Sequence, residues 1–146
     1  MRTNALLAVA ALLFVASCGS GDEATDPKDA TATTAPAEVD LSDKDFKDLT
    51  GETEVVIQAR DNTFVPAYVE VTEGTKVIVR NVGRTEHNVI PSEDGALEPI
   101  EATELEPKDE VEVTFNHEGT YPYPYYCSLH GTPTAGMNGA VRVVGE

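Results

Sequence analysis

Short apolar runs separated by turn residues dominate the chain from residue 51 onward. β-Branched residues are concentrated in runs at 54–59, 64–71, 75–82, 89–90, 110–115 and 139–144. In the run at 110–115, Val111, Val113 and Phe115 alternate with polar side chains, which is the period-two pattern of a half-buried strand. Short runs of this kind with closely spaced turns are typical of an all-β sandwich or barrel. We therefore predict one all-β domain over residues 51–146.

Prolines complicate two of these runs. Pro66 predicts a kink or a sheet edge. In 119-GTYPYPYYC-127 the alternation places Tyr121, Tyr123, Tyr125 and Cys127 on one face. However, Pro122 and Pro124 cannot donate backbone hydrogen bonds. We expect an extended but irregular segment before Tyr125, with its prolines facing an edge.

Two further segments leave alternatives open. Residues 42–51 offer Ser42 as an N-cap and Gly51 as a stop, and predict either one or two helical turns or more linker. Residues 92–107 are acidic and contain proline, which indicates a loop or a weak strand.

The N-terminus indicates export. The apolar run at 5–16 has 12 residues, too few to span a bilayer, which needs about 20, but suited to a signal peptide. It ends in 15-VASC-18, which resembles the lipobox of bacterial lipoproteins. We expect a signal peptide at 1–17, a lipidated Cys18 and a disordered acidic linker over 18–50. The protein would then be anchored by acyl chains at the extracytoplasmic face of the cell membrane. The alternative is an ordinary signal peptide, with Cys18 incidental.

Charge limits the partners. The formal net charge is −16, and residues 51–146 hold 17 Asp and Glu against 6 Lys and Arg. This balance argues against nucleic-acid binding, which needs a basic face, and against electrostatic attachment to anionic lipid. The acidic surface either steers a basic partner or serves solubility.

The stretch 125-YYCSLHGTPTAGM-137 brings together Cys127, His130 and Met137. With Cys18 lipidated, Cys127 has no disulfide partner in an oxidising compartment. It is therefore a metal ligand, a reactive thiol, an intermolecular partner or a small buried hydrophobe. A further strong ligand would have to be His87 or His117. Because His117 lies in the polar, Gly-containing turn 115-FNHEG-119, we expect it at the surface.

This set of side chains favours copper. Two imidazoles and a thiolate with a long axial thioether suit a blue-copper electron-transfer site. Zinc also binds Cys and His, but its sites usually add another Cys, His or carboxylate, or a water molecule. We therefore predict one type 1 copper ion.

The segments 61–91 and 119–141 resemble the plastocyanin and azurin family, the cupredoxins. The shared motifs are Asn-x-Gly-x-x-x-His-Asn-Val and Tyr-Tyr-Cys-x-x-His, followed by Gly-Met-x-Gly. The resemblance implies a Greek-key β-sandwich with copper near one end. It also implies the ligands His87, Cys127, His130 and Met137. Six residues separate His130 from Met137, where plastocyanin has four.

The same resemblance gives two supporting residues their roles. Asn88 matches the residue whose side chain joins the two ligand segments, and Ser128 would be its partner. Such bonds around a metal site fix the geometry of its ligands.

These features predict a membrane-tethered carrier of single electrons. The alternative is an extracytoplasmic protein that binds, delivers or buffers copper. We do not expect an enzyme: the chain has three His, too few for the extra histidine clusters of catalytic copper centres. We expect a monomer whose redox protein partners the sequence does not identify.

Overall fold

The computed structural model describes residues 38–119 and 121–145. The predicted signal peptide, Cys18 and linker residues 18–37 lie outside the described residues. Within the described part of the chain, no helix is long and apolar enough to cross a membrane.

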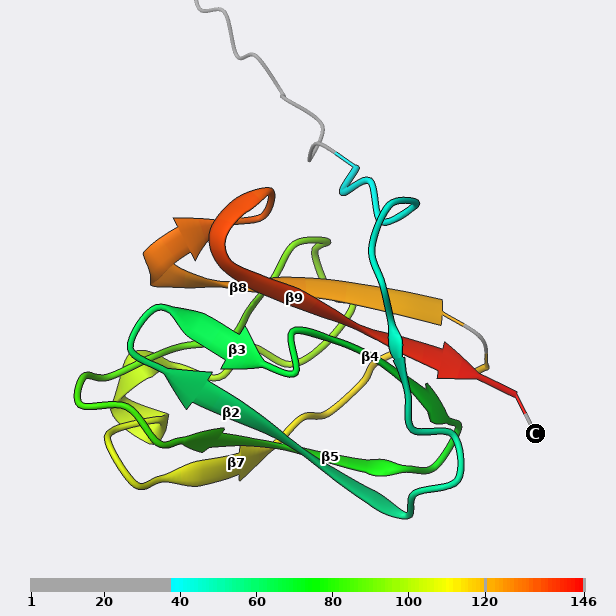
Figure 1. Cartoon of the computed structure of the whole chain (residues 1–146), viewed down its shortest axis with the longest axis horizontal. Helices are drawn as coiled ribbons and strands as arrows, with labels where there is room; N and C mark the ends of the chain where they lie inside the picture. The colour runs from blue at the N-terminus through cyan, green and yellow to red at the C-terminus, as the bar shows by residue number, and fades with distance from the viewer. Residues whose placement is uncertain (1–37, 120, 146) are drawn as a thin grey trace, which may run out of the picture. The chain divides into compact units, whose positions relative to one another are not determined.

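Two β-sheets form the domain (Figure 1). The first has the order β1-β4-β9-β8-β6, with bounds Lys47–Asp48, Tyr68–Thr72, Ala135–Val144, Tyr121–Thr132 and Ile90–Pro91. The second has the order β3-β2-β5-β7, with bounds Thr63–Val65, Glu54–Arg60, Lys76–Asn81 and Glu110–Glu112. The chain crosses repeatedly between the sheets, so that β4 pairs with β9 and β2 with β5, both in parallel. The predicted all-β, Greek-key-type sandwich is confirmed.

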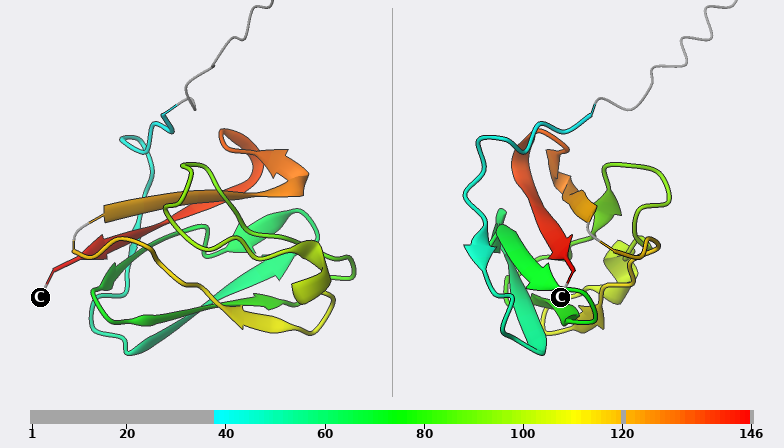
Figure 2. Two further views of the ribbon diagram at one scale, coloured as in Figure 1. Left: turned by 180° about the vertical axis from the view of Figure 1, so that it is seen from behind. Right: turned by 90° about the vertical axis from the view of Figure 1, so that its right-hand side faces the viewer.

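The core lies between the two sheets, which Figure 2 shows as separate layers. Alternate residues of β2, namely Val55, Ile57 and Ala59, are buried while their neighbours are more exposed. From the opposite sheet, Tyr125 packs edge-on against Phe64 of β3, with 5.0 Å between ring centroids. Burial of these alternating apolar side chains is the main stabilising contribution to the fold.

The prediction of an irregular segment before Tyr125 is wrong. Residues 121–126 pair continuously with β9. The carbonyl of Pro124 accepts a hydrogen bond from the Ser92 N–H at 2.9 Å, on the β6 side. Because the N and C=O of one strand residue point the same way, the nitrogen of Pro124, and by period two that of Pro122, points away from β9. The prolines therefore remove no hydrogen bond between β8 and β9. They point to the side of β8 that faces β6, which agrees with the expectation that they face an edge.

The segment 42–51 forms neither helical turns nor only linker. It contributes β1, which pairs in parallel with β4 through Lys47↔Val69 and Asp48↔Glu70. The acidic segment 92–107 is a loop with one 3₁₀ turn, η1 (Ala102–Glu104). Its apolar residues Leu97, Ile100 and Leu105 are buried, so this loop closes part of the core.

Candidate metal centre

A bulge in the β8–β9 hairpin collects three of the four predicted ligands. Tyr126 pairs with Asn138 and Gly131 pairs with Gly136, so residues 127–130 of β8 lie opposite Met137 alone on β9. The extra residues must bow outward, which is how bulges redirect side chains. The segment 127–137 is thus mostly a hairpin, and only Pro133 and Thr134 at its tip lie outside the strands.

The fourth residue, His87, comes from the segment between β5 and β6. Its Nδ1 lies 3.8 Å from Cys127 Sγ, and Nδ1 of His130 lies 3.5 Å from the same sulfur. The ligand atoms of His87, Cys127 and His130 all lie within 4.8 Å of one another. His87, Cys127 and Met137 are fully buried, whereas His130 is half-buried. The structure therefore brings the three strongest predicted ligands together and buries Met137 in the same core cluster as Cys127.

These spacings fit a shared metal ion. Bonds of about 2.3 Å to a thiolate and about 2.1 Å to an imidazole, as zinc makes, place sulfur and nitrogen about 3.6 Å apart at a tetrahedral angle. The two observed Nδ1–Sγ distances bracket this value. Both histidines face the sulfur with the same ring atom, as ligands of one ion would.

Burial also decides between the alternatives for Cys127. Its side chain is completely enclosed, and it is a free thiol. An intermolecular disulfide would need an accessible sulfur. The role as a buried hydrophobe does not account for two imidazole nitrogens that face the sulfur.

The electrostatics favour the ligating form of His87. Burial lowers its pKa below the ordinary 6.5, the neighbouring His130 lowers it further, and Asp61 acts in the opposite direction. A neutral imidazole is the form that binds a metal.

The predicted link between the two ligand segments is present. Ser128 N–H donates to Asn88 Oδ1 at 2.8 Å, and Asn88 Nδ2 donates to Ser128 Oγ at 2.9 Å. These bonds hold the residues directly after His87 and Cys127 against each other.

Asn81 organises the turn that leads to His87, and the sequence reasoning missed this role. Its Nδ2 donates to the carbonyls of Thr85 (2.8 Å) and Leu105 (2.9 Å), and its Oδ1 accepts from Gly83 N–H (2.8 Å). The side chain is 1% exposed. The available signal was an Asn two residues before a Gly, where an Asn side chain commonly forms a local turn.

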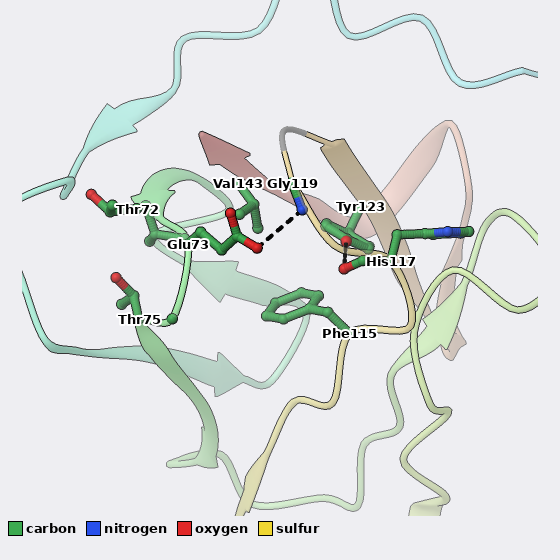
Figure 3. Close-up of a pocket in the computed structure, with 10 residues that line it drawn as sticks. Thr72, Glu73, Thr75, Phe115, His117, Gly119, Tyr123 and Val143 are labelled. Atoms are coloured by element: carbon green, nitrogen blue, oxygen red, sulfur yellow. Dashed lines mark hydrogen bonds between the residues drawn. The ribbon is translucent and has the colours of Figure 1, made fainter. Parts of the chain in front are cut away.

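His117 lies apart from the cluster, as predicted. It is exposed, and its carbonyl accepts a bond from the Tyr123 hydroxyl at 2.9 Å. It borders a cavity of about 100 Å³ whose lining includes Glu73 and Phe115. Figure 3 shows its imidazole pointing away from both side chains.

Comparisons with known proteins agree with this geometry. A family model described as copper binding proteins, plastocyanin/azurin family, matches residues 51–144. Plastocyanin of Rumex obtusifolius is 32% identical over 89 residues, covering 55% of this chain and 86% of that protein. Chloroplastic plastocyanin of Silene latifolia subsp. alba is 31% identical over 101 residues, and this chain spans 59% of its length. The structure of a reduced amicyanin mutant matches with a TM-score of 0.50 and 22% identity, covering 62% of this chain and 82% of that one, which supports the fold.

The side chains and the matched family identify the same metal. Two imidazoles and one thiolate beside a buried methionine form the set of ligands that copper selects. The cofactor of this site is copper, and the four residues are arranged as a type 1 copper site.

Proposed function

This chain belongs to the plastocyanin/azurin family of copper-binding proteins, and from that premise we propose that it carries single electrons between redox partners. His87, Cys127, His130 and Met137 would bind one type 1 copper ion. The observation that carries the proposal is the convergence of two imidazole Nδ1 atoms on one buried thiol. The bound copper would supply the one-electron chemistry by alternating between Cu(II) and Cu(I).

The protein's part is to hold the ligands still and to exclude water. Cys127 and His130 are fixed by a hairpin, and His87 is tied to the same hairpin through Asn88 and Ser128. Ligands held by such a frame change little when the charge of the metal changes. This frame favours an electron carrier over a protein that must release its copper.

His130 provides the exit for the electron. It is the one half-buried residue of the imidazole–thiol cluster. The apolar residues Leu129 (48% exposed), Pro133 and Ala135 belong to the same hairpin. Residues 119–141 contain no Asp, Glu, Lys or Arg. A partner could approach this uncharged surface closely, which efficient electron transfer requires.

The cellular setting belongs to the same proposal. Cys18 would carry acyl chains that anchor the domain outside the cytoplasmic membrane, since two chains give stable attachment where one is marginal. The protein would act there as a monomer on extracytoplasmic redox proteins. A Cys18→Ala variant should move from the membrane fraction to the soluble fraction, and one that stays membrane-bound would contradict the lipid anchor.

Visible absorption tests the copper site. Cu(II) added to the full-length protein should produce an intense blue thiolate-to-copper band that reductant bleaches and oxidant restores. Cys127→Ser should abolish the band, while His117→Ala, at the surface residue, should keep it. Copper binding without the band would instead indicate a copper-delivery or buffering protein.

A further inference from the structure

Met137 has no ladder partner of its own, although its neighbours Gly136 and Asn138 pair with Gly131 and Tyr126 of β8. On the β8 side, the ladder is interrupted between Tyr126 and Gly131. On the other side, pairing with β4 begins only at Tyr68↔Ala140. The residue after Met137, Asn138, is joined to β4 by a side chain, because the Tyr68 hydroxyl donates to Asn138 Oδ1 at 2.8 Å.

Gly139 brings β9 close to the segment that carries Tyr68. A Cβ at this position would lie 2.3 Å from the Ala67 carbonyl oxygen, so the backbone of β9 lies tightly against the residue before Tyr68. The backbone that leads into Tyr68 therefore packs directly against the residues that follow Met137.

Tyr68 is held in turn by residues 38–49, which we call the N-terminal arm. The Phe46 ring meets the Tyr68 ring edge-on at 5.7 Å, and Lys44 Nζ lies 5.9 Å from the centre of the Tyr68 ring. The guanidinium of Arg142, from β9 itself, stacks 3.7 Å from the centre of the Phe46 ring. Such aromatic and cation–π contacts stabilise the position of the ring that they surround.

The arm also faces the tip of the ligand hairpin. A cavity of about 200 Å³ is lined on one side by arm residues, including Asp43 and Lys44, and on the other by Pro133, Thr134 and Asn138. The arm and the hairpin that carries Cys127, His130 and Met137 are thus close neighbours (Figure 1).

We propose that Tyr68 and Asn138, supported by the N-terminal arm, position the Met137 thioether that would contact the copper ion. The inference rests on the proposed copper function. Neither Tyr68 nor Asn138 is one of the four proposed ligands, and they act through Met137. Since the axial ligand tunes the potential of blue-copper sites, their removal should alter the potential more than the retention of copper.

Tyr68→Phe is the test variant, because it removes the hydroxyl and keeps the ring. Tyr121→Phe is the matched control. It removes a hydroxyl bonded to Glu93 at the start of β8, six residues and about 20 Å of strand before Cys127. If Tyr68→Phe fails to fold, Asn138→Ala removes the same bond from the acceptor side.

The first measurement needs no copper. The chain has two methionines, Met1 and Met137, so a methionine-methyl NMR spectrum of the metal-free full-length protein reports on Met137 directly, and Met137→Leu assigns the signal. Tyr68→Phe should shift or broaden this signal, and Tyr121→Phe should leave it in place. An unmoved Met137 signal in Tyr68→Phe would overturn the inference whether or not the protein carries electrons.

The second measurement uses the copper-loaded protein. In a fixed redox buffer, Tyr68→Phe should change the ratio of oxidised to reduced protein by about threefold or more, which is about 28 mV for one electron. The effect should vanish in a Met137→Leu background, because the two residues act in series. An equal change in that background, or from Tyr121→Phe, would refute action through Met137. Absence of the blue band in the unmodified protein would instead refute the proposed function.

Discussion

At the residue scale, Asn88 joins ligand segments that are 40 residues apart in the sequence. Its side chain is 6% exposed and makes two bonds to Ser128, one to the backbone N–H and one to the hydroxyl. When one partner of a buried hydrogen bond is removed, the remaining polar group stays buried with neither a hydrogen-bond partner nor water, which costs free energy. Both the stability of the fold and the geometry of the ligands therefore depend on this one side chain.

Asn88→Ala should lower the free energy of unfolding of the metal-free protein by about 1–3 kcal/mol. It should also weaken copper binding by about 10–100-fold, the usual effect of losing a residue that orients metal ligands. Urea unfolding and competition with a copper chelator measure the two effects. Ser128→Ala, which keeps the bond from its backbone N–H, is the control and should cost less. Equal losses of stability and of copper affinity in the two variants would mean that the bond from Ser128 N–H to Asn88 is not the more important of the two.

Gly83 leaves just enough room for the His87 ring. A Cβ there would lie 3.2 Å from His87 Nε2 and equally close to the backbone of Arg60 and Asp61. Gly83→Ala should therefore displace the imidazole and destabilise the protein by about 1–3 kcal/mol, together with a shift of the blue band. Gly51→Ala is the control, since a Cβ at Gly51 meets nothing within 4 Å. Identical spectra for the two variants would show that the His87 pocket can expand at no cost.

At the element scale, the tyrosines of β8 couple stability to alkaline pH. The bond to Glu93 raises the pKa of Tyr121 from 10.0 to about 12, and burial raises the pKa values of Tyr123 and Tyr125. The folded state thus holds these phenols protonated where the unfolded chain would release their protons. Their stabilising contribution is complete below about pH 10 and is lost as the pH rises through the folded-state pKa values.

The wild-type free energy of unfolding should therefore fall steeply between about pH 10 and pH 12. Tyr121→Phe removes one of the three phenols and should make that fall shallower. Urea unfolding of the metal-free protein at a series of pH values measures both slopes. Equal slopes would mean that the Tyr121–Glu93 bond does not persist in solution.

The elements that could be predicted are those whose burial follows from local pattern. In β2 and β5, β-branched residues alternate or run together, and their strands appear where the pattern places them. Two elements depend on partners that no local pattern reveals. β1 is a strand because Lys47 and Asp48 meet the free edge of β4. β8 pairs regularly over residues 121–126 because its prolines face away from β9.

The features of the candidate site can also be separated into those that the sequence predicts and those that depend on the fold. Residue type and spacing marked Cys127, His130 and Met137, because few other roles bring a thiol, an imidazole and a thioether together. The bulge that turns them inward depends on the register between β8 and β9, which pairing of the whole strands sets. The link from Tyr68 to Asn138 spans 70 residues and requires the fold to be known.

At the scale of the whole molecule, the acidic side chains lie outside the hairpin that carries Cys127, His130 and Met137. Residues 51–146 have 11 more acidic than basic side chains, yet residues 119–145 contain no carboxylate side chain. Several of the basic side chains are already paired, with Arg80 on Glu110, Arg84 on Asp61 and Arg142 on Glu70. Most of the unpaired charge is therefore negative and lies outside the hairpin that carries three of the ligands.

This segregation determines how two copies should exchange electrons. Two copies meeting at the tips of their hairpins, where residues 121–141 include no Asp, Glu, Lys or Arg, still carry like net charges. The repulsion between them is weakly screened at low salt, where the Debye length is about 30 Å at 0.01 M. Added salt shortens that length to about 8 Å at 0.15 M, so the rate of electron self-exchange between Cu(I) and Cu(II) protein should rise with ionic strength. NMR line broadening in mixtures of the two forms measures that rate across a salt series. A rate that falls with salt would mean that opposite charges meet in the encounter, and that the copies do not approach through the tips of their hairpins.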